Sequence, residues 1–407
     1  MFKSLLRNPR AVLIGCVALL APAAARADTV YQFDVNGTTS GSGVTNGGTY
    51  NWSDPAGFWN TDTTGVAQPV VWPTGTANDA QFSAGTDGNA TFTVTIGSTN
   101  ESVKNVNVLL GNVTIGAAGD TGHFSLTASD TWSAVPGTSL IVNDNISQSS
   151  RTLFTDTNSP TISGPDGFVT FNGVLSSTTG GIVRRGGNGT VTLTGNNTYA
   201  GTTLIQGHNG TLLIDGVQSN GGNYSFDPGT NFDANASGTI GGTGTAGMAA
   251  GKTFTAAGPS ITQFAIVAPG DPSKNGGIGT FTIGSTGATN TTTIGDNAKL
   301  AIDVNGLSSD LLAVNGNLTL TGTNDILAIN DLGNGSFDGI DSYTIATYTG
   351  TLTGTFASTT GLPSGYRVDY GTTVSNAITL DPAVPEPASL GLIALGALGF
   401  FRRRRGH

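Results

Sequence analysis

Residues 184–216 read RRGGNGTVTLTGNNTYAGTTLIQGHNGTLLIDG and hold three copies of one short pattern, at 189–195 (GTVTLTG), 201–207 (GTTLIQG) and 210–216 (GTLLIDG). In each copy Gly-Thr opens a run of about five residues in which Thr accompanies Val, Leu or Ile, and Gly closes the run. Such β-branched and aliphatic runs between glycines are typical of short strands that end in turns. We therefore predict short β-strands that recur about every ten to twelve residues.

The same texture returns later in the chain, at 279–284 (GTFTIG), 299–306 (KLAIDVNG), 310–316 (DLLAVNG) and 317–322 (NLTLTG). No helical periodicity interrupts it, which disfavours βαβ units and nucleotide-binding folds. A sandwich or barrel would also use short strands, but self-similarity that is local and open-ended favours a solenoid. In a solenoid we expect Thr and Asn to form ladders on successive coils and Val, Leu and Ile to fill the interior.

The composition supports an all-β chain. Of 407 residues, 62 are Gly, 62 are Thr and 33 are Asn, types that favour strands and turns over helices. Disorder would require few apolar residues and high net charge, whereas 37% of residues are hydrophobic and 10% are charged. The length allows one large domain or two to three medium ones.

The net charge of −10 is unevenly distributed. Residues 28–384 hold 25 acids and 8 bases, a charge of −17, while both ends of the chain are basic. An acidic body of this kind excludes nucleic acid as a partner, because nucleic-acid binding relies on basic surfaces.

Residues 1–27 have the order of a secretory signal: a basic start, an apolar run over 11–20, and small residues that end in Ala25 and Ala27. We predict cleavage after Ala27. The alternative is a lipoprotein signal around Cys16, which leaves an apolar core of only four residues after Arg10. Cys16 is the one Cys of the chain, so the body contains no disulfide and no thiol chemistry.

The C-terminal segment 384–407 has three ordered parts. A Pro-containing motif comes first, the uncharged stretch 388–401 follows, and four basic residues come next: Val384, Pro385, Glu386 and Pro387, then Arg402, Arg403, Arg404 and Arg405. Fourteen helical residues span about 21 Å, less than a hydrocarbon core of about 30 Å, so a transmembrane helix here would be short. We expect the arginines to stay cytoplasmic and the body to lie across the membrane.

These three parts together resemble a PEP-CTERM sorting signal. The resemblance implies recognition by an exosortase, a membrane processing enzyme, and release or attachment of the exported protein at the cell surface. The alternative is a Pro-containing linker before an ordinary tail anchor.

The opening stretch 184–216 resembles the autotransporter-associated, or passenger-associated, β-strand repeat. The matching parts are GTVTL at 189–193, NTYxGTT at 197–203 and GTL at 210–212, whereas Arg184 or Arg185 replaces the usual Lys. The resemblance implies a right-handed parallel β-helix. Residues 268–316 and 354–380 resemble the late and closing parts of such passengers, and after Leu380 we expect the sorting tail in place of a membrane barrel.

Aromatic residues gather near the N-terminus, with Trp52, Phe58, Trp59, Trp72 and Phe82 within about 30 residues. Bulky rings suit a cap over the first coil of a solenoid. The alternative is a sugar-stacking platform, with Trp52, Trp59 and Trp72 as the glycan contacts.

Catalytic and metal-binding motifs are scarce. A Ser-His-Asp triad would depend on His123 or His208, and the sequence has no HExxH, Walker or paired-Cys motif. Asp-rich turns can supply oxygen ligands for calcium, and the nearest candidates are Asp325, Asp331, Asn334 and Asp338. Their spacing lacks the order of an EF-hand, so we interpret them as turn residues. We predict no catalytic residue, cofactor or metal.

A polysaccharide lyase is the enzymatic alternative, because such enzymes use parallel β-helices and a basic residue near acidic ligands. The arginines of the body are Arg151, Arg184, Arg185 and Arg367. We predict instead an exported, non-enzymatic structural or adhesive protein of the cell surface or extracellular matrix. Exopolysaccharide is a candidate partner, and a glycan-binding surface module is the second hypothesis.

The expected organisation is a signal peptide at 1–27, a cap and first strands at 28–100 and a solenoid at 101–260. Closing strands at 261–381 and the sorting signal at 384–407 complete it, the latter with a membrane helix at 388–401 that anchors the protein transiently.

Overall fold

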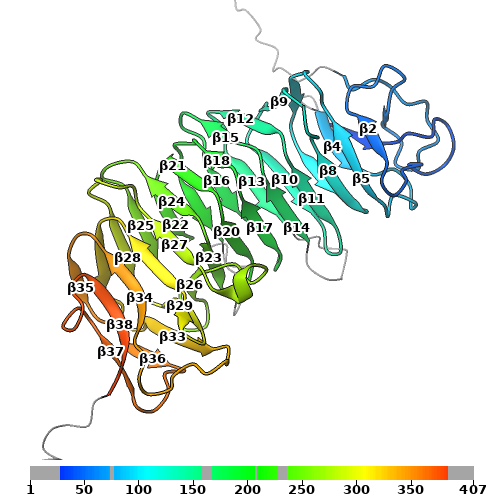
Figure 1. Ribbon diagram of the computed structural model, residues 1–407. Helices are drawn as coiled ribbons and strands as arrows, with labels where there is room; N and C mark the ends of the chain where they lie inside the picture. Colours follow the sequence, from blue (N-terminus) through cyan, green and yellow to red (C-terminus); the bar gives the residue numbers. More distant parts are fainter. Residues whose placement is uncertain (1–27, 74–77, 158–166, 207–208, 228–235, 384–407) are drawn as a thin grey trace, which may run out of the picture.

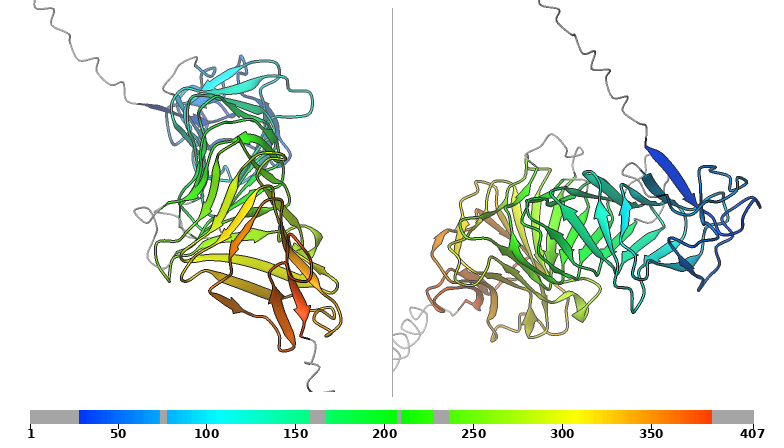
Figure 2. Two further views of the ribbon diagram at one scale, coloured as in Figure 1. Left: turned by 90° about the vertical axis from the view of Figure 1, so that its left-hand side faces the viewer. Right: turned by 90° about the horizontal axis from the view of Figure 1, so that it is seen from above.

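The computed structural model describes residues 28–73, 78–157, 167–206, 209–227 and 236–383. Within them the chain is all-β apart from one 3-10 turn, η1 (Asn275–Gly277). Figure 1 shows the strands stacked in chain order along an elongated body, and Figure 2 shows the same stack from two further sides. Short strands separated by turns were predicted from the Gly-Thr runs, and the described residues confirm an all-β solenoid with parallel strands.

Two long sheets run the length of the body. The first, sheet A, has 13 strands, in the spatial order β3 (Trp59–Asn60), β1 (Thr29–Phe33), β4 (Asn78–Phe82), β7 (Val106–Val108), β10 (Asp130–Ala134), β13 (Leu153–Asp156), β16 (Ile182–Arg184), β19 (Thr203–Ile205), β22 (Tyr224–Phe226), β25 (Thr253–Ala256), β28 (Thr291–Ile294), β32 (Asn317–Leu320) and β35 (Leu352–Gly354). Except for the antiparallel pair β1 and β3, its neighbours are parallel.

The second long sheet, sheet B, also has 13 strands. They are β2 (Thr49–Asn51), β5 (Thr91–Thr95), β8 (Asn112–Ile115), β11 (Ser139–Val142), β14 (Phe168–Phe171), β17 (Thr190–Leu193), β20 (Thr211–Ile214), β23 (Gly238–Gly242), β26 (Ala265–Pro269), β29 (Ala298–Asn305), β33 (Ile326–Asp331) and β36 (Ser358–Thr360), with β30 (Ser308–Ser309) paired to β29.

The third face is divided between two sheets. Sheet C holds β6 (Glu101–Val103), β9 (His123–Leu126), β12 (Asn145–Ser149) and β15 (Leu175–Ser177). Sheet D follows with β18 (Asn196–Asn197), β21 (Val217–Gly221), β24 (Thr245–Met248), β27 (Thr280–Ile283), β31 (Leu311–Val314), β34 (Tyr343–Tyr348), β38 (Ala377–Pro382) and β37 (Tyr366–Asp369). The last three form an antiparallel closing unit.

The coil is longer than the interval we predicted. Thr190 pairs with Thr211, 21 residues on, and Ser139 pairs with Phe168, 29 residues on. The predicted interval of ten to twelve residues also exceeds the step between strands within this coil, because β17, β18, β19 and the following β20 begin at residues 190, 196, 203 and 211. Of the three Gly-Thr copies, the first and third stack in sheet B and the second lies in sheet A.

The interior is built from stacked columns of equivalent residues. One column of sheet B contains ten residues, each at most 2% exposed: Phe92, Val113, Leu140, Val169, Val191, Leu212, Ile240, Val267, Leu300 and Leu327. Strand β17 alternates half-exposed Thr with buried Val and Leu, as a period of two requires. One hydrophobic cluster spans the body from Phe33 to Leu380, so the regions 28–100, 101–260 and 261–381 share a continuous core.

Glycine opens and closes the repeated strands because the coils approach closely at both positions. A Cβ on Gly189 would lie 2.0 Å from the carbonyl oxygen of Gly167, and one on Gly216 would lie 2.3 Å from that of Gly195. Neither position has the left-handed backbone that favours glycine, so lack of space accounts for both residues.

Candidate functional site: the cap, the polar ladders and the buried charges

The tryptophans proposed as glycan contacts lie inside the N-terminal cap. Trp52 and Trp59 are 0% exposed and Trp72 is 4% exposed. The ring centroids are 4.7 Å apart for Trp52 and Trp59, and 4.7 Å for Trp59 and Trp72. The indole nitrogen of Trp59 donates to the Trp52 carbonyl at 2.7 Å. A sugar cannot reach these covered ring faces, so we correct the assignment of all three residues from glycan contact to core of the cap.

Asn side chains link successive coils at the end of sheet B, as the ladder prediction expects. The amide of Asn143 donates to the Gly116 carbonyl at 2.9 Å, and the amide of Asn172 donates to Asn143 Oδ1 at 2.8 Å. On the next coil the hydroxyl of Thr194 donates to Asn172 Oδ1. These bonds satisfy polar groups along the edge of the stack and present a polar surface.

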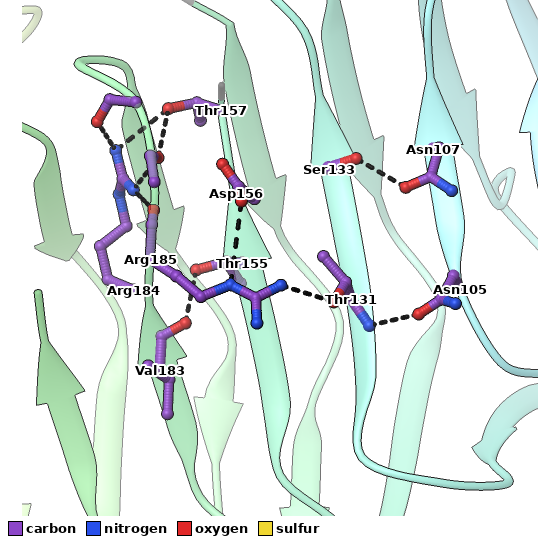
Figure 3. Close-up of polar contacts among 12 residues, drawn as sticks. Asn105, Asn107, Thr131, Ser133, Thr155, Asp156, Thr157, Val183, Arg184 and Arg185 are labelled. Atoms are coloured by element: carbon purple, nitrogen blue, oxygen red, sulfur yellow. Dashed lines mark hydrogen bonds and ion pairs between the residues drawn. The ribbon is translucent and has the colours of Figure 1, made fainter. Parts of the chain in front are cut away.

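The outer face of sheet A carries a second polar ladder, drawn in Figure 3. The hydroxyl of Ser133 donates to Asn107 Oδ1 at 2.7 Å, and Thr131 N donates to Asn105 Oδ1 at 2.7 Å. Arg185 extends across two preceding coils: its Nη2 donates to Thr131 Oγ1 at 2.9 Å. The same guanidinium forms an ion pair with Asp156 at 3.8 Å and lies 4.6 Å from the centre of the Phe154 ring.

Arg184, the preceding residue, points the other way. It is 0% exposed and occupies the interior column between Thr155 and Ile205. Its guanidinium donates to the carbonyls of Gly186 at 2.6 Å, Gly187 at 2.9 Å and Gly189 at 2.6 Å. A Cβ on Gly210 would lie 1.9 Å from Arg184 Nη2, so that glycine leaves room for the buried charge.

The four arginines considered for a lyase therefore do not meet. Arg184 is covered, Arg185 is engaged by Asp156 and Thr131, Arg151 is exposed after β12, and Arg367 lies on β37 at the C-terminal end of the stack (Figure 1). The basic residue that abstracts a proton in such enzymes needs an accessible position next to acidic ligands. Arg184 lacks that access.

The histidines are also separate. His123 begins β9, where its backbone N–H donates to Asn100 Oδ1 at 3.2 Å, and its side chain borders a polar hollow with Asn145, Ser147 and Ser176. His208 lies outside the described residues.

The proposed turn residues bond either within their own turns or to a neighbouring coil. Asp325 is buried and its Oδ1 accepts from Ala357 N at 2.7 Å, whereas Asp338 Oδ1 accepts from Ile340 N at 2.8 Å. Asp331 accepts from Gly333 N, and Asn334 bonds Asn305 on the preceding coil. Across the described ranges, no group of three His, Asp or Glu side chains is placed to hold a metal ion.

Several buried acids with raised pKa values were not predicted from the sequence. Burial raises the pKa of Asp144 to about 7, with a further contribution from the charge of Asp120. Burial likewise raises the pKa of Asp310 to about 7, although hydrogen bonds from Asp303 N and Gly279 N oppose the shift. Asp34 and Asp130 have pKa values raised to about 6 by burial. Sequence reasoning missed them because each Asp reads as an ordinary turn residue.

The predicted signal peptide and sorting signal fall outside the described residues. They comprise the cleavage residues Ala25 and Ala27, the sorting residues Val384, Pro385, Glu386 and Pro387, the stretch 388–401, and Arg402, Arg403, Arg404 and Arg405. Among the residues that the structure describes, no helix has the length and apolar character needed to cross a bilayer.

Comparison with known proteins identifies the C-terminal segment. Residues 383–405 match the PEP-CTERM protein-sorting motif. This match confirms the resemblance noted at the C-terminus and implies exosortase-dependent sorting of an exported protein. The chain thus carries a PEP-CTERM sorting motif, and part of it is similar to an autotransporter.

A particular relative supports the second half of that description. Over 207 residues the chain is 29% identical to the adhesin BmaC autotransporter of Brucella suis biovar 1 (strain 1330). The aligned segment covers 51% of this chain and 5% of the adhesin. The similarity therefore concerns a small part of a much longer protein, and with the sorting motif it supports an exported protein of the cell surface.

Proposed function

We propose that this protein is a non-enzymatic structural or adhesive rod of the cell surface or extracellular matrix. The observation that carries the proposal is a PEP-CTERM motif at 383–405 behind a parallel β-solenoid. Similarity to an autotransporter that is named an adhesin supports the adhesive part. The polar ladders add support, because rows of Asn, Thr and Ser offer many weak hydrogen-bonding sites to another surface.

An exosortase processes the tail in this proposal. Residues 388–401 hold the chain transiently in the membrane, and the arginines at 402–405 stay cytoplasmic. Cleavage takes place near Glu386. The signal peptide at 1–27 is cleaved after Ala27.

One experiment tests sorting and placement together. A chain with Pro385→Ala and Pro387→Ala is compared with the natural chain by cell fractionation and by mass spectrometry of both termini. We expect the natural protein in the surface or extracellular fraction, starting at Asp28 and ending near Glu386, and the variant retained with an intact tail. Recovery of residues 402–407 in the surface fraction of the natural protein would contradict processing.

A second experiment tests the non-enzymatic, adhesive role. Cells that lack the protein should attach to surfaces and to each other less well than cells that carry it, and the purified protein should leave polyuronates intact. Formation of unsaturated products from a polyuronate would support the lyase alternative and overturn the proposal.

A further inference from the structure

A groove of about 440 Å³ hollows the outer face of sheet B beside strands β14, β17 and β20. Its floor includes Thr170, Thr190 and Thr192, and Phe168 lies along it. The wall is the loop of residues 271–274, which follows β26. We call this feature the sheet B groove.

Ion pairs fix the wall of the sheet B groove. Lys274 Nζ lies 2.6 Å from Asp215 Oδ2 and 3.2 Å from Asp271 Oδ2, which ties the loop to a residue 59 positions earlier. Asp215 is held in turn, since its Oδ1 accepts from Thr243 N at 2.9 Å. A wall that is already ordered reduces the conformational cost of binding a ligand.

Phe168 gives the groove an aromatic contact. It is 53% exposed on the outward side of β14, and its partners in register are Ser139 and Thr190. A large ring between these two polar neighbours, more than half exposed, contributes little to the core and remains accessible to solvent. The negative face of such a ring attracts the weakly positive C–H groups of a sugar, so Phe168 suits a saccharide ring.

The floor offers hydroxyl groups in register. Thr170 pairs with Thr192, so their side chains lie on adjacent strands about 4.8 Å apart. A Thr hydroxyl both donates and accepts hydrogen bonds, as do the hydroxyls of a saccharide.

The charge of the groove selects among saccharides. Burial raises the pKa of Asp271, but hydrogen bonds from Ser273 and Lys274 outweigh it and keep that pKa below its usual range. A hydrogen bond to Asp215 raises the pKa of Lys274. The border thus carries two acids to one base, within a body of charge −17, and an anionic chain would be repelled.

We propose that the sheet B groove binds a neutral polysaccharide, with one sugar unit packed on Phe168 and its hydroxyls bonded to Thr170 and Thr192. The inference rests on the proposed function, because it names the kind of ligand that the surface rod would hold. Asp215 and Lys274 keep the wall of the groove in place. The hydroxyls of Thr170 and Thr192 on the floor form the hydrogen bonds to the sugar.

The test is affinity gel electrophoresis of the protein purified from the cells that produce it, through gels that contain dextran, galactomannan, a soluble β-glucan or polygalacturonate. We expect retardation by at least one neutral polysaccharide and none by polygalacturonate. Phe168→Ala should weaken the association constant about ten-fold or more, Phe168→Trp should preserve it, and Thr192→Val should weaken it about three-fold.

Thr293→Val, on the outer face of sheet A, is the matched control and should leave the affinity unchanged. Because Phe168 is exposed, Phe168→Ala should also leave the melting temperature unchanged. The inference is overturned by binding to polygalacturonate alone, by no binding to any neutral polysaccharide, or by binding that survives Phe168→Ala. None of these outcomes alters the fractionation result that tests the proposed function, so the two failures are distinguishable.

Discussion

The aromatic cap at residues 28–100 and the coils from β14 to β22 solve one packing problem in two ways. Each coil has a neighbour above and below, so columns of Val, Leu and Ile cover one another. The cap has a neighbour on one side only, and it closes the open end with rings. For example, the ring centroid of Phe33 lies 5.1 Å from that of Trp59 and 5.1 Å from that of Phe82. A repeated structure therefore needs large, unrepeated side chains where the repeat begins.

The largest expected effect breaks the cap. Trp59→Ala removes a fully buried ring and the bond to the Trp52 carbonyl, and we expect a loss of about 3–5 kcal/mol in the unfolding free energy. Urea unfolding followed by tryptophan fluorescence measures it, and hydrogen exchange shows where protection is lost. The matched coil variant, Leu193→Ala, should lower protection mainly in β14, β17 and β20. Equal spread of both effects along the body would contradict the local role of the cap.

A second variant compares the two adjacent arginines of the repeat. Arg184→Met leaves the carbonyls of Gly186, Gly187 and Gly189 without their buried donor, and we expect a loss of about 2–4 kcal/mol. Arg185→Met removes a partly exposed ion pair, and its cost should stay below about 1 kcal/mol. Urea midpoints of the two variants give the difference; equal midpoints would show that the buried guanidinium is dispensable.

A third variant tests the ladder between coils. Asn172→Ala removes the bonds to Asn143 and Thr194, and we expect a loss of about 1 kcal/mol, because these bonds lie near the surface. Asn188→Ala, at an exposed turn of the same repeat, is the control and should cost less than about 0.5 kcal/mol. Urea unfolding of both variants makes the comparison, and an unchanged midpoint for Asn172→Ala would mean that the ladder does not stabilise the stack.

The smallest expected effect concerns pH. Asp144 has a folded pKa of about 7, above its unfolded value of about 4, so its stabilising contribution is complete below pH 4 and is lost as pH rises to 7. The natural protein should therefore melt at a higher temperature at pH 5 than at pH 8. Asp144→Asn should reduce that difference by about 1–3 °C in calorimetry. Asp62→Asn is the control: hydrogen bonds from Thr64 lower the pKa of Asp62, so its contribution is lost only below about pH 4.

Much of the fold follows from local sequence. The run at 189–195 predicts a strand by itself, because burial is favourable for Val191 and Leu193 whereas Thr190 and Thr192 can remain solvated. The ladder of Asn143 and Asn172 follows from the same stacking logic. The coil length does not, since which strand pairs with which depends on turns of variable length that no single copy of the repeat defines.

The candidate sites divide in a similar way. The sorting motif is readable because its three parts are contiguous in sequence. The direction of Arg184 and Arg185 is not, because two neighbouring residues in a strand point to opposite faces and the sequence alone leaves open which one turns inward. The sheet B groove combines Phe168 with Lys274, more than a hundred residues apart, and only the stacking of coils brings them together.

The pairing of each coil only with its neighbours makes length an adjustable quantity. Sheet A stacks 13 strands, and at about 4.8 Å per strand the stack reaches roughly 60 Å. Insertion or removal of one coil would change that reach by a single step and leave the cap and the closing unit of β34, β37 and β38 intact. In a body built this way, the reach of the stack and the chemistry of its two ends are independent of each other.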